Sequence, residues 1–314
     1  MAPVKVAVAG ATGNVGLPVI QALLDANYSV TALTRKGSNS ASKLPQSSNL
    51  TVKEVDYTSV SDLKAALEGI KVVVSTLATT SIGEQYPLID ASIAAGVERI
   101  LPSEFGSDLD NPKTAALPVF KYKVEVQNYL KAKVKEYPNF SYTLLYTGPF
   151  FDWGLEHGFF LNPAKHSGVL YNGGDAKFST TTLKTIGRAV VGVIEHLAET
   201  ANRAVYVHDT VTTQNKLIAY AKEKDGKEWD TSVKSTRDVY QESLDELTKG
   251  GDIGKAMVGF ILSGLFGGDE TGASYEGRTD NALLGIKELS EQEVKEVVQR
   301  FVTPNPKTKM DVKL

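Results

Sequence analysis

The chain has 314 residues, of which 42% are hydrophobic and 23% are charged. These fractions are typical of folded globular proteins and exclude a disordered or fibrous chain. The formal net charge at pH 7 is −3 and no long run of one sign occurs, so nucleic acid is not expected as a partner. The length fits two domains or one large α/β unit, and small molecules are the expected partners.

The sequence contains no cysteine, which excludes disulfide bonds, thiolate zinc sites, iron–sulfur clusters and cysteine nucleophiles. No metal site is expected. The N-terminal apolar stretch is too short for a signal peptide, and the longest apolar run, Ala256–Phe266, is about half as long as a membrane span. We therefore expect a soluble, cytoplasmic protein without a membrane partner, present as a monomer or a homodimer.

Short β-branched runs alternate with longer helical patterns over the first half of the chain, which predicts a parallel sheet with helices on both faces. The predicted strands are Val4–Ala9, Ser29–Leu33, Thr51–Val55, Val72–Thr76, Arg99–Pro102 and Ser141–Tyr146. The predicted helices are Val15–Ala26, Ser61–Leu67, Gln85–Ala95 and Pro118–Lys135. The predicted fold class is α/β, a doubly wound parallel sheet with a smaller α/β region after it.

The regular alternation stops near Phe150, where glycine, proline and aromatic residues crowd together. This change predicts a boundary between a first domain, residues 1–150, and a second region, residues 151–314. A later strand and helix over residues 203–225 are expected to rejoin the main sheet.

A glycine-rich turn lies between the first predicted strand and the first predicted helix, with its three glycines spaced by three residues. Glycines let the backbone turn tightly and approach a diphosphate, whose charge the free amides and the positive end of the helix dipole stabilise. A turn without a ligand is the alternative, which the strand–turn–helix context disfavours. The candidate contacts in this turn are Gly10, Thr12, Gly13, Asn14, Val15 and Gly16.

The end of the second predicted strand carries two cations, Arg35 and Lys36, and no acidic residue lies between Ala26 and Lys53. An acidic residue there would bind the ribose of NAD, whereas a guanidinium binds a phosphate through two hydrogen bonds. Arg35 and Lys36 therefore predict NADP(H), with a solvated loop cation as the alternative. Asp56 could accept a hydrogen bond from the adenine amino group or cap a helix.

One lysine lies on the apolar face of the helix predicted from Pro118. Lys123 is three or four residues from its apolar neighbours, whereas Lys121 lies off this face and can pair with Glu125. Partial burial lowers the pKa of a lysine and makes it a usable acid or base. We expect Lys123 to move a proton or to hydrogen-bond the nicotinamide ribose, against the alternative of a structural lysine whose charge reaches solvent.

Tyr129 and Lys133 match the Tyr-x-x-x-Lys spacing that short-chain dehydrogenases use for proton transfer. Lys133 lies roughly 15 Å further along the helix than Lys123, away from the sheet edge where a cofactor binds. We therefore reject this pair and expect Tyr129 to be a core residue.

The first half resembles the NmrA-like, isoflavone-reductase-like branch of the atypical short-chain dehydrogenases, which includes phenylcoumaran benzylic ether and pinoresinol–lariciresinol reductases. The resemblance covers Val4 to about Phe151 and rests on Gly10–Gly16, Thr34-Arg35, Val74–Thr76, Gln85, Leu101–Gly106 and Phe120–Lys123. It implies a Rossmann fold, NADPH as the cofactor, a phosphate-binding residue at Arg35 and a general base at Lys123. It also implies cofactor contacts at Thr76, Leu77 and Gln85.

The second half departs from this pattern. The chain between Trp153 and Gly285 matches the plant reductases less closely, and Lys249–Gly277 looks like an added or altered segment. Residues 151–314 are expected to bind mainly the substrate, so no plant substrate is assumed.

These features predict an NADPH-dependent reductase that transfers hydride to a conjugated or aromatic small molecule, with Lys123 as general acid or base. Aromatic side chains near the sheet edge would stack on a flat substrate, although many such residues are core residues. Ser103 would donate to a substrate oxygen or form a turn. The candidate substrate contacts are Ser103, Phe105, Phe150, Phe151, Trp153 and His157.

Two other functions fit the same fold. A non-catalytic regulator would bind NADP(H) and pass its redox state to a protein partner, which Lys123 argues against. The second alternative is an enzyme that carries out a non-redox rearrangement or cyclisation in the same site.

Overall fold

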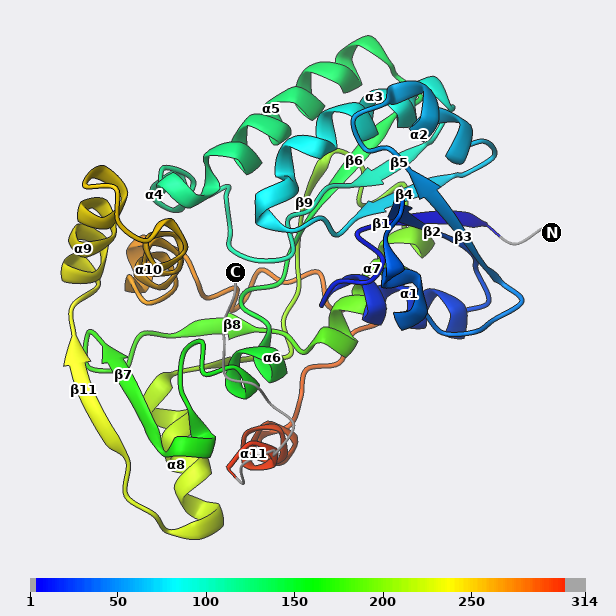
Figure 1. Ribbon diagram of the computed structural model, residues 1–314. Helices are drawn as coiled ribbons and strands as arrows, with labels where there is room; N and C mark the ends of the chain where they lie inside the picture. The colour runs from blue at the N-terminus through cyan, green and yellow to red at the C-terminus, as the bar shows by residue number, and fades with distance from the viewer. Residues whose placement is uncertain (1–3, 303–314) are drawn as a thin grey trace.

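The computed structural model describes residues 4–302 and contains a main sheet of seven parallel strands in the order β3-β2-β1-β4-β5-β6-β9 (Figure 1). The strands are β1 (Lys5–Ala9), β2 (Ser29–Arg35), β3 (Leu50–Val55), β4 (Val72–Ser75), β5 (Arg99–Leu101), β6 (Ser141–Tyr146) and β9 (Arg203–Tyr206). The predicted doubly wound α/β fold is confirmed.

The centre of this sheet is apolar because its strands are covered on both faces. Val6 of β1 pairs with Val30 of β2 on one side and with Val72 of β4 on the other, and all three side chains are buried. The strand order reverses between β1 and β4. Ligands of doubly wound sheets bind at the carboxyl ends of the strands at such a reversal.

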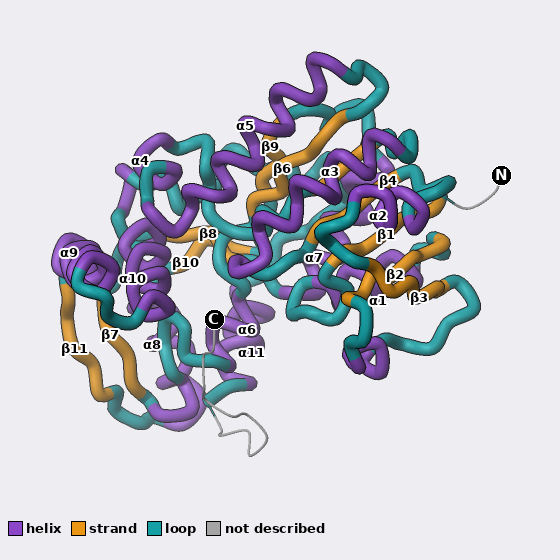
Figure 2. The backbone as a smooth tube through the Cα atoms, turned by 45° about the horizontal axis from the view of Figure 1, so that its top comes forward, coloured by secondary structure: helices purple, strands orange, loops and turns teal. Residues whose placement is uncertain are grey.

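Two groups of helices cover the two faces of the sheet (Figures 1 and 2). One face packs against α1 (Gly16–Asp25) and α7 (Leu183–Glu195), and the other against α2 (Val60–Ala66), α3 (Gln85–Ala94) and α5 (Lys121–Glu136). The helix expected from Pro118 begins with a short 3-10 turn, η3 (Pro118–Phe120), and continues as α5.

The first hydrophobic core lies between the sheet and α2, α3 and α5, and the second between the sheet and α1 and α7. A third core lies within the chain that follows residue 150. Its helices are α6 (Phe151–Glu156), α8 (Gln214–Asp225), α9 (Thr236–Thr248), α10 (Ile253–Leu265) and α11 (Glu291–Arg300). The short helix α4 (Pro112–Ala115) packs instead against the core on the side of α2, α3 and α5, and α10 contributes to that core as well. Two two-stranded ribbons lie outside the main sheet. The strands β7 (Ser167–Tyr171) and β11 (Asp230–Lys234) pair in parallel, and β8 (Phe178–Thr180) and β10 (Thr210–Thr212) pair antiparallel. The remaining 3-10 turns are η1 (Asn39–Lys43), η2 (Thr79–Glu84), η4 (Pro163–Lys165) and η5 (Gly268–Glu270).

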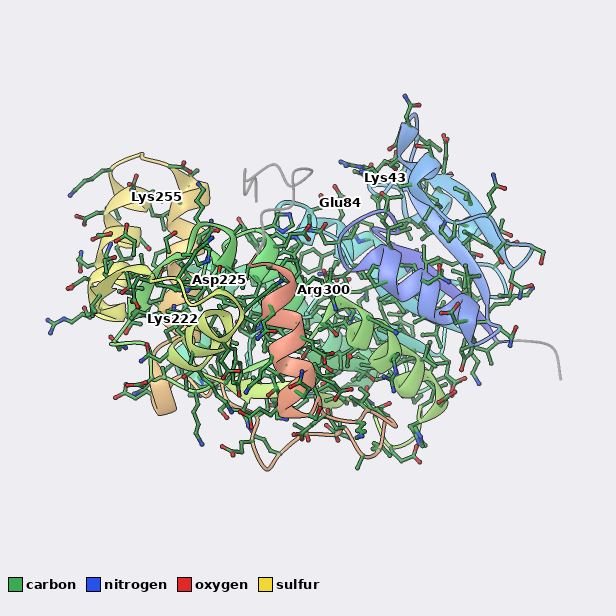
Figure 3. All side chains as sticks on the ribbon, turned by 90° about the horizontal axis from the view of Figure 1, so that it is seen from below. Lys43, Glu84, Lys222, Asp225, Lys255 and Arg300 are labelled. Atoms are coloured by element: carbon green, nitrogen blue, oxygen red, sulfur yellow. The ribbon has the colours of Figure 1, made fainter. Side chains whose placement is uncertain are left out.

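Two elements that follow residue 150 pack with the first half of the chain. β9 lies beside β6, and α7 lies so close to α1 that a Cβ at Gly187 would come within 2.5 Å of the Pro18 carbonyl oxygen. The chain beyond residue 150 therefore contributes both to the main sheet layer and to the third core. In Figure 3, Lys43 and Glu84 mark the end of the molecule that contains the main sheet, and Lys222 and Lys255 mark the opposite end, formed by the chain after residue 150.

Within residues 4–302, no helix is long and apolar enough to cross a bilayer.

Candidate functional site

The glycine turn after β1 has a backbone that only glycine allows. Gly10 has a φ of +75°, and a Cβ there would lie 2.6 Å from the carbonyl oxygen of Thr76 at the end of β4. A Cβ at Gly16 would lie 2.4 Å from the carbonyl oxygen of Gly10. The first and third glycines therefore let the turn fold tightly across the reversal point of the sheet.

The N-terminus of α1 directly behind this turn has no capping side chain. Val15 occupies the N-cap position, and the first turn contains no acidic residue. The neighbouring helix α7 differs, because the Thr182 side chain caps it and the carboxylates of Asp152 and Asp209 accept main-chain amides there. An uncapped helix N-terminus behind a close-packed glycine turn fits a phosphate group, whose oxygens accept the free amides.

Several predicted contacts at the carboxyl edge connect strand ends to one another. The Thr76 hydroxyl donates to the Ala9 carbonyl oxygen at 2.8 Å. The Ser103 hydroxyl donates to the Leu77 carbonyl oxygen at 2.6 Å, and its amide donates to Oε1 of Gln85 at 2.8 Å. Ser103 is therefore a turn-forming residue here, because its hydroxyl proton is already used. Gln85 is buried and supports this turn.

The cations after β2 have different surroundings. Lys36 forms an ion pair with Asp62 at 3.0 Å, whereas the exposed guanidinium of Arg35 has no hydrogen bond or ion pair with any residue in the described part of the chain. Arg35 is therefore the cation available to a phosphate.

Asp56 closes its own turn. Its Oδ1 accepts from the amide and the hydroxyl of Thr58, and these hydrogen bonds hold the pKa of Asp56 below its usual value. The N-cap of α2 is Ser59, so the interpretation of Asp56 as the helix cap was wrong.

Lys123 lies in the first turn of α5 and is half-buried. Its Nζ donates to the main-chain carbonyl oxygen of Glu104, just after β5, at 2.6 Å. Burial lowers the pKa of Lys123, and the nearby Glu104 carboxylate opposes this change. The ammonium is therefore held at the carboxyl edge in surroundings that favour the loss of its proton.

The rejected Tyr129 and Lys133 pair has a structural partner. The Tyr129 hydroxyl and the Lys133 ammonium both bind Asp90 of α3, at 2.7 and 2.9 Å, so the pair joins α3 to α5. The ion pairs in the described part of the chain do not include the pair between Lys121 and Glu125 that their spacing allows.

Five buried side-chain atoms of the described residues have no hydrogen-bond partner: Oγ1 of Thr34, Oγ of Ser75, Oε2 of Glu104, Oδ1 of Asp209 and Nε1 of Trp229. The first three belong to residues at or just beyond the carboxyl ends of β2, β4 and β5. Unsatisfied buried polar atoms are rare in folded proteins. Thr34, Ser75 and Glu104 therefore lie at the edge of the sheet where ligands of doubly wound folds bind.

The predicted aromatic contacts divide into two groups. Phe105 and Phe151 are buried in the second and third cores, so the structure does not bring them to an open surface. Phe150 is partly buried and lies edge-on to Trp153, and Trp153 stacks on His157 with a centroid distance of 4.6 Å. Nδ1 of His157 also contacts the Trp153 carbonyl oxygen. Trp153 and His157 therefore form one unit on α6.

Two sizeable cavities lie elsewhere in the described chain. One, of about 430 Å³, lies beside β7 and is lined by Phe159, Leu161 and Asp230 among others. The other, of about 690 Å³, lies between α1 and α7 beside Arg188 and Glu195. Neither is lined by Lys123 or by the glycine turn.

Sequence reasoning missed two side chains that hold the site. The first is Tyr57, whose hydroxyl accepts from the Gly10 amide at 3.3 Å. The second is Glu104, which lies in the Leu101–Gly106 segment of the family resemblance but was not predicted as a site residue. A charged residue directly after a buried strand was the available signal for Glu104. No local signal marks Tyr57.

Comparisons with known proteins agree with this geometry. The sequence model of the NmrA-like family matches residues 3–257. Oxidoreductase poxI of Penicillium oxalicum is 31% identical over 304 residues, covering 93% of both chains. Oxidoreductase aprR of Aspergillus flavus is 33% identical over 272 residues, covering 85% of this chain and 90% of that protein.

Among solved structures, leucoanthocyanidin reductase of Vitis vinifera in its binary complex with NADPH has the same fold. The TM-score is 0.76 at 21% identity, with 95% of this chain and 99% of that chain covered. The match of the family model over most of the chain identifies this protein: it belongs to the NmrA-like family.

Proposed function

We propose that this protein is an NADPH-dependent reductase that transfers hydride to a conjugated or aromatic small molecule. The uncapped N-terminus of α1 behind the glycine turn carries this proposal, because free amides at the reversal point of such a sheet would bind a phosphate group. The orphaned polar atoms at the same edge add to it.

The chain offers distinct groups to the two ends of the coenzyme. The amides between Gly10 and Gly16 would bind the diphosphate, and the unpaired guanidinium of Arg35 would bind the 2′-phosphate. When bound, NADPH supplies the hydride. Thr76 and Leu77 lie between the glycine turn and Ser103, at the reversal point of the sheet.

Lys123 would hold and move the proton that accompanies reduction. Its Nζ donates to the Glu104 carbonyl oxygen, and burial lowers its pKa, which favours release of its proton. The Trp153–His157 unit and the partly buried Phe150 would bind a flat substrate by stacking.

The relatives support this assignment. Two of them are named oxidoreductases, and a more distant one is a phenylcoumaran benzylic ether reductase of Pinus taeda, 27% identical over 232 residues and covering 70% of this chain. A neighbour of the same fold is a leucoanthocyanidin reductase with NADPH.

The test measures binding and turnover on the purified protein. We expect NADPH to bind more tightly than NADH in calorimetry, and NADPH to be consumed with at least one member of a panel of enones, imines and quinone methides. Lys123→Ala should abolish turnover but keep NADPH binding. Binding without turnover together with a tight protein partner would instead support a redox sensor, and product formation without NADPH oxidation would support a rearrangement.

A further inference from the structure

The residue whose main-chain carbonyl binds Lys123 also carries a buried carboxylate, which forms no ion pair with Lys123 within 4.0 Å among the described residues. Glu104 is 3% exposed, and its main-chain carbonyl accepts the Lys123 ammonium at 2.6 Å. Its side chain turns inward, where Oε1 accepts from Nε2 of Gln127 at 3.1 Å. Oε2 has no hydrogen-bond partner among the described residues.

The backbone fixes Glu104 in this position. The amide of Glu104 donates to the Pro102 carbonyl oxygen at 2.7 Å, and the amide of Phe105 donates to the Leu145 carbonyl oxygen of β6 at 3.0 Å. Phe105 has a φ of +36°, a left-handed conformation that is unusual for a bulky side chain. Strained backbone of this kind persists only where the surrounding structure enforces it.

Few charges face this carboxylate. Lys123 and Lys131, of which Lys123 has the larger effect on Glu104, belong to α5, and Asp110 belongs to the loop after β5. On the sheet side, the Tyr146 hydroxyl of β6 accepts from the same Gln127 amide, and Tyr206 of β9 packs on Tyr146. Lys123 is therefore the main counter-charge of Glu104.

The two groups influence each other in opposite senses. Burial raises the pKa of Glu104, and the charge of Lys123 opposes this rise. Burial lowers the pKa of Lys123, and the charge of Glu104 opposes that fall. The loss of one charge therefore makes the other charge harder to keep.

We propose that Glu104 is a positioning residue for Lys123: its main-chain carbonyl holds the ammonium in place, and its buried carboxylate is the counter-charge that sets the protonation state of this ammonium. The catalytic consequence rests on the proposed reductase function. The electrostatic coupling does not, because it exists in the protein without cofactor or substrate.

The test is a titration of Lys123 by NMR in the cofactor-free full-length protein labelled with ¹³C at lysine Cε. The Lys123 resonance is assigned by its absence from Lys123→Arg. Glu104→Gln keeps the side-chain size and an oxygen for Gln127 but removes the charge. We expect it to lower the pKa of Lys123 by about one pH unit or more, as the loss of a nearby opposite charge does.

Glu125→Gln is the matched control, since it removes an exposed carboxylate from the same helix two residues from Lys123. It should leave the titration unchanged. Gln127→Met is a second variant, which removes the hydrogen bond to Oε1, makes the ionised carboxylate less stable and should lower the pKa of Lys123 in the same direction. The titration is interpreted only for variants whose circular dichroism matches the unmodified protein.

An unchanged Lys123 titration in folded Glu104→Gln or Gln127→Met would overturn the proposal. A shift of equal size in Glu125→Gln would also overturn it, because any nearby carboxylate would then act alike. Lack of NADPH binding would instead overturn the proposed function and leave the titration result intact. In the active enzyme, the Lys123 limb of the pH–kcat profile should move with the NMR value, whereas a purely structural role of Glu104 would not move it.

Discussion

The hydroxyl of Tyr57 lies between the amide of Gly10, which donates to it at 3.3 Å, and the carbonyl oxygen of Leu33, to which it donates at 3.1 Å. It thus joins the glycine turn after β1 to β2, the strand that ends at Arg35. Burial raises the pKa of Tyr57 to about 12, so the hydroxyl keeps its proton at neutral pH. One side chain therefore connects the two proposed phosphate-binding positions.

Tyr57→Phe should weaken both the fold and NADPH binding. The substitution removes two hydrogen bonds from a buried site, and we expect the free energy of unfolding to fall by about 1–2 kcal/mol and the Kd for NADPH to rise several-fold. Urea unfolding and calorimetry measure the two effects. Tyr137→Phe, at an exposed tyrosine, is the control, and an equal effect in both variants would contradict the special role of Tyr57.

Gly16→Ala should prevent NADPH binding, because its Cβ would lie 2.4 Å from the Gly10 carbonyl oxygen. The turn must then open, and the amides move away from the diphosphate. Gly83→Ala is the matched control, since a Cβ there meets no atom within 4 Å and its φ is not left-handed. Calorimetry should show lost binding in the first variant and unchanged binding in the second. Normal binding by Gly16→Ala would place the diphosphate elsewhere.

Arg35→Ala should reduce the preference for NADPH over NADH. A charge-assisted hydrogen bond contributes about 1.5–3 kcal/mol, so we expect roughly a tenfold to hundredfold increase in the Kd for NADPH and little change for NADH. Lys36→Ala should have a smaller effect because Lys36 is already paired with Asp62. Equal losses for both coenzymes would argue against a 2′-phosphate contact.

Glu104→Gln should change how stability depends on pH. Burial raises the pKa of Glu104 above its unfolded value, so its contribution to stability is fully present below the unfolded pKa and is lost as the pH rises through the folded pKa. The Tm of Glu104→Gln relative to the unmodified protein should therefore increase as the pH rises above the unfolded pKa of a glutamate. Differential scanning calorimetry across this range tests the sign, and a difference that shrinks with rising pH would refute it.

Arg278→Met should destabilise the loop that follows β5. Nη1 of Arg278 binds the buried carboxylate of Asp108 at 2.8 Å, and the guanidinium lies over the ring of Tyr206. Removing it leaves a buried carboxylate with fewer donors, which should cost about 2 kcal/mol of unfolding free energy. Lys177→Met, which breaks the exposed pair with Glu276, should change stability little. Thermal unfolding of both variants gives the comparison.

The first half of the fold was predictable because its signals are local. Strand and helix periods and the spacing of the glycines are properties of short segments, and the strands predicted at Val4–Ala9 and Ser141–Tyr146 correspond to β1 and β6. The ribbon of β7 and β11 was missed. Its strands are largely exposed or half-buried and pair across roughly 60 residues of chain, so neither shows a clear alternation.

The doubly wound sheet, the glycine turn at the start of α1 and the position of Lys123 on an apolar face could all be predicted from short segments of the chain. The packing of α7 against α1, the hydrogen bond of Tyr57 to the glycine turn and the binding of Lys123 by the Glu104 carbonyl appear only in the folded protein. The reason is physical: backbone conformation responds to neighbouring residues, whereas burial, hydrogen-bond partners and pKa values depend on side chains that packing brings together from distant parts of the chain.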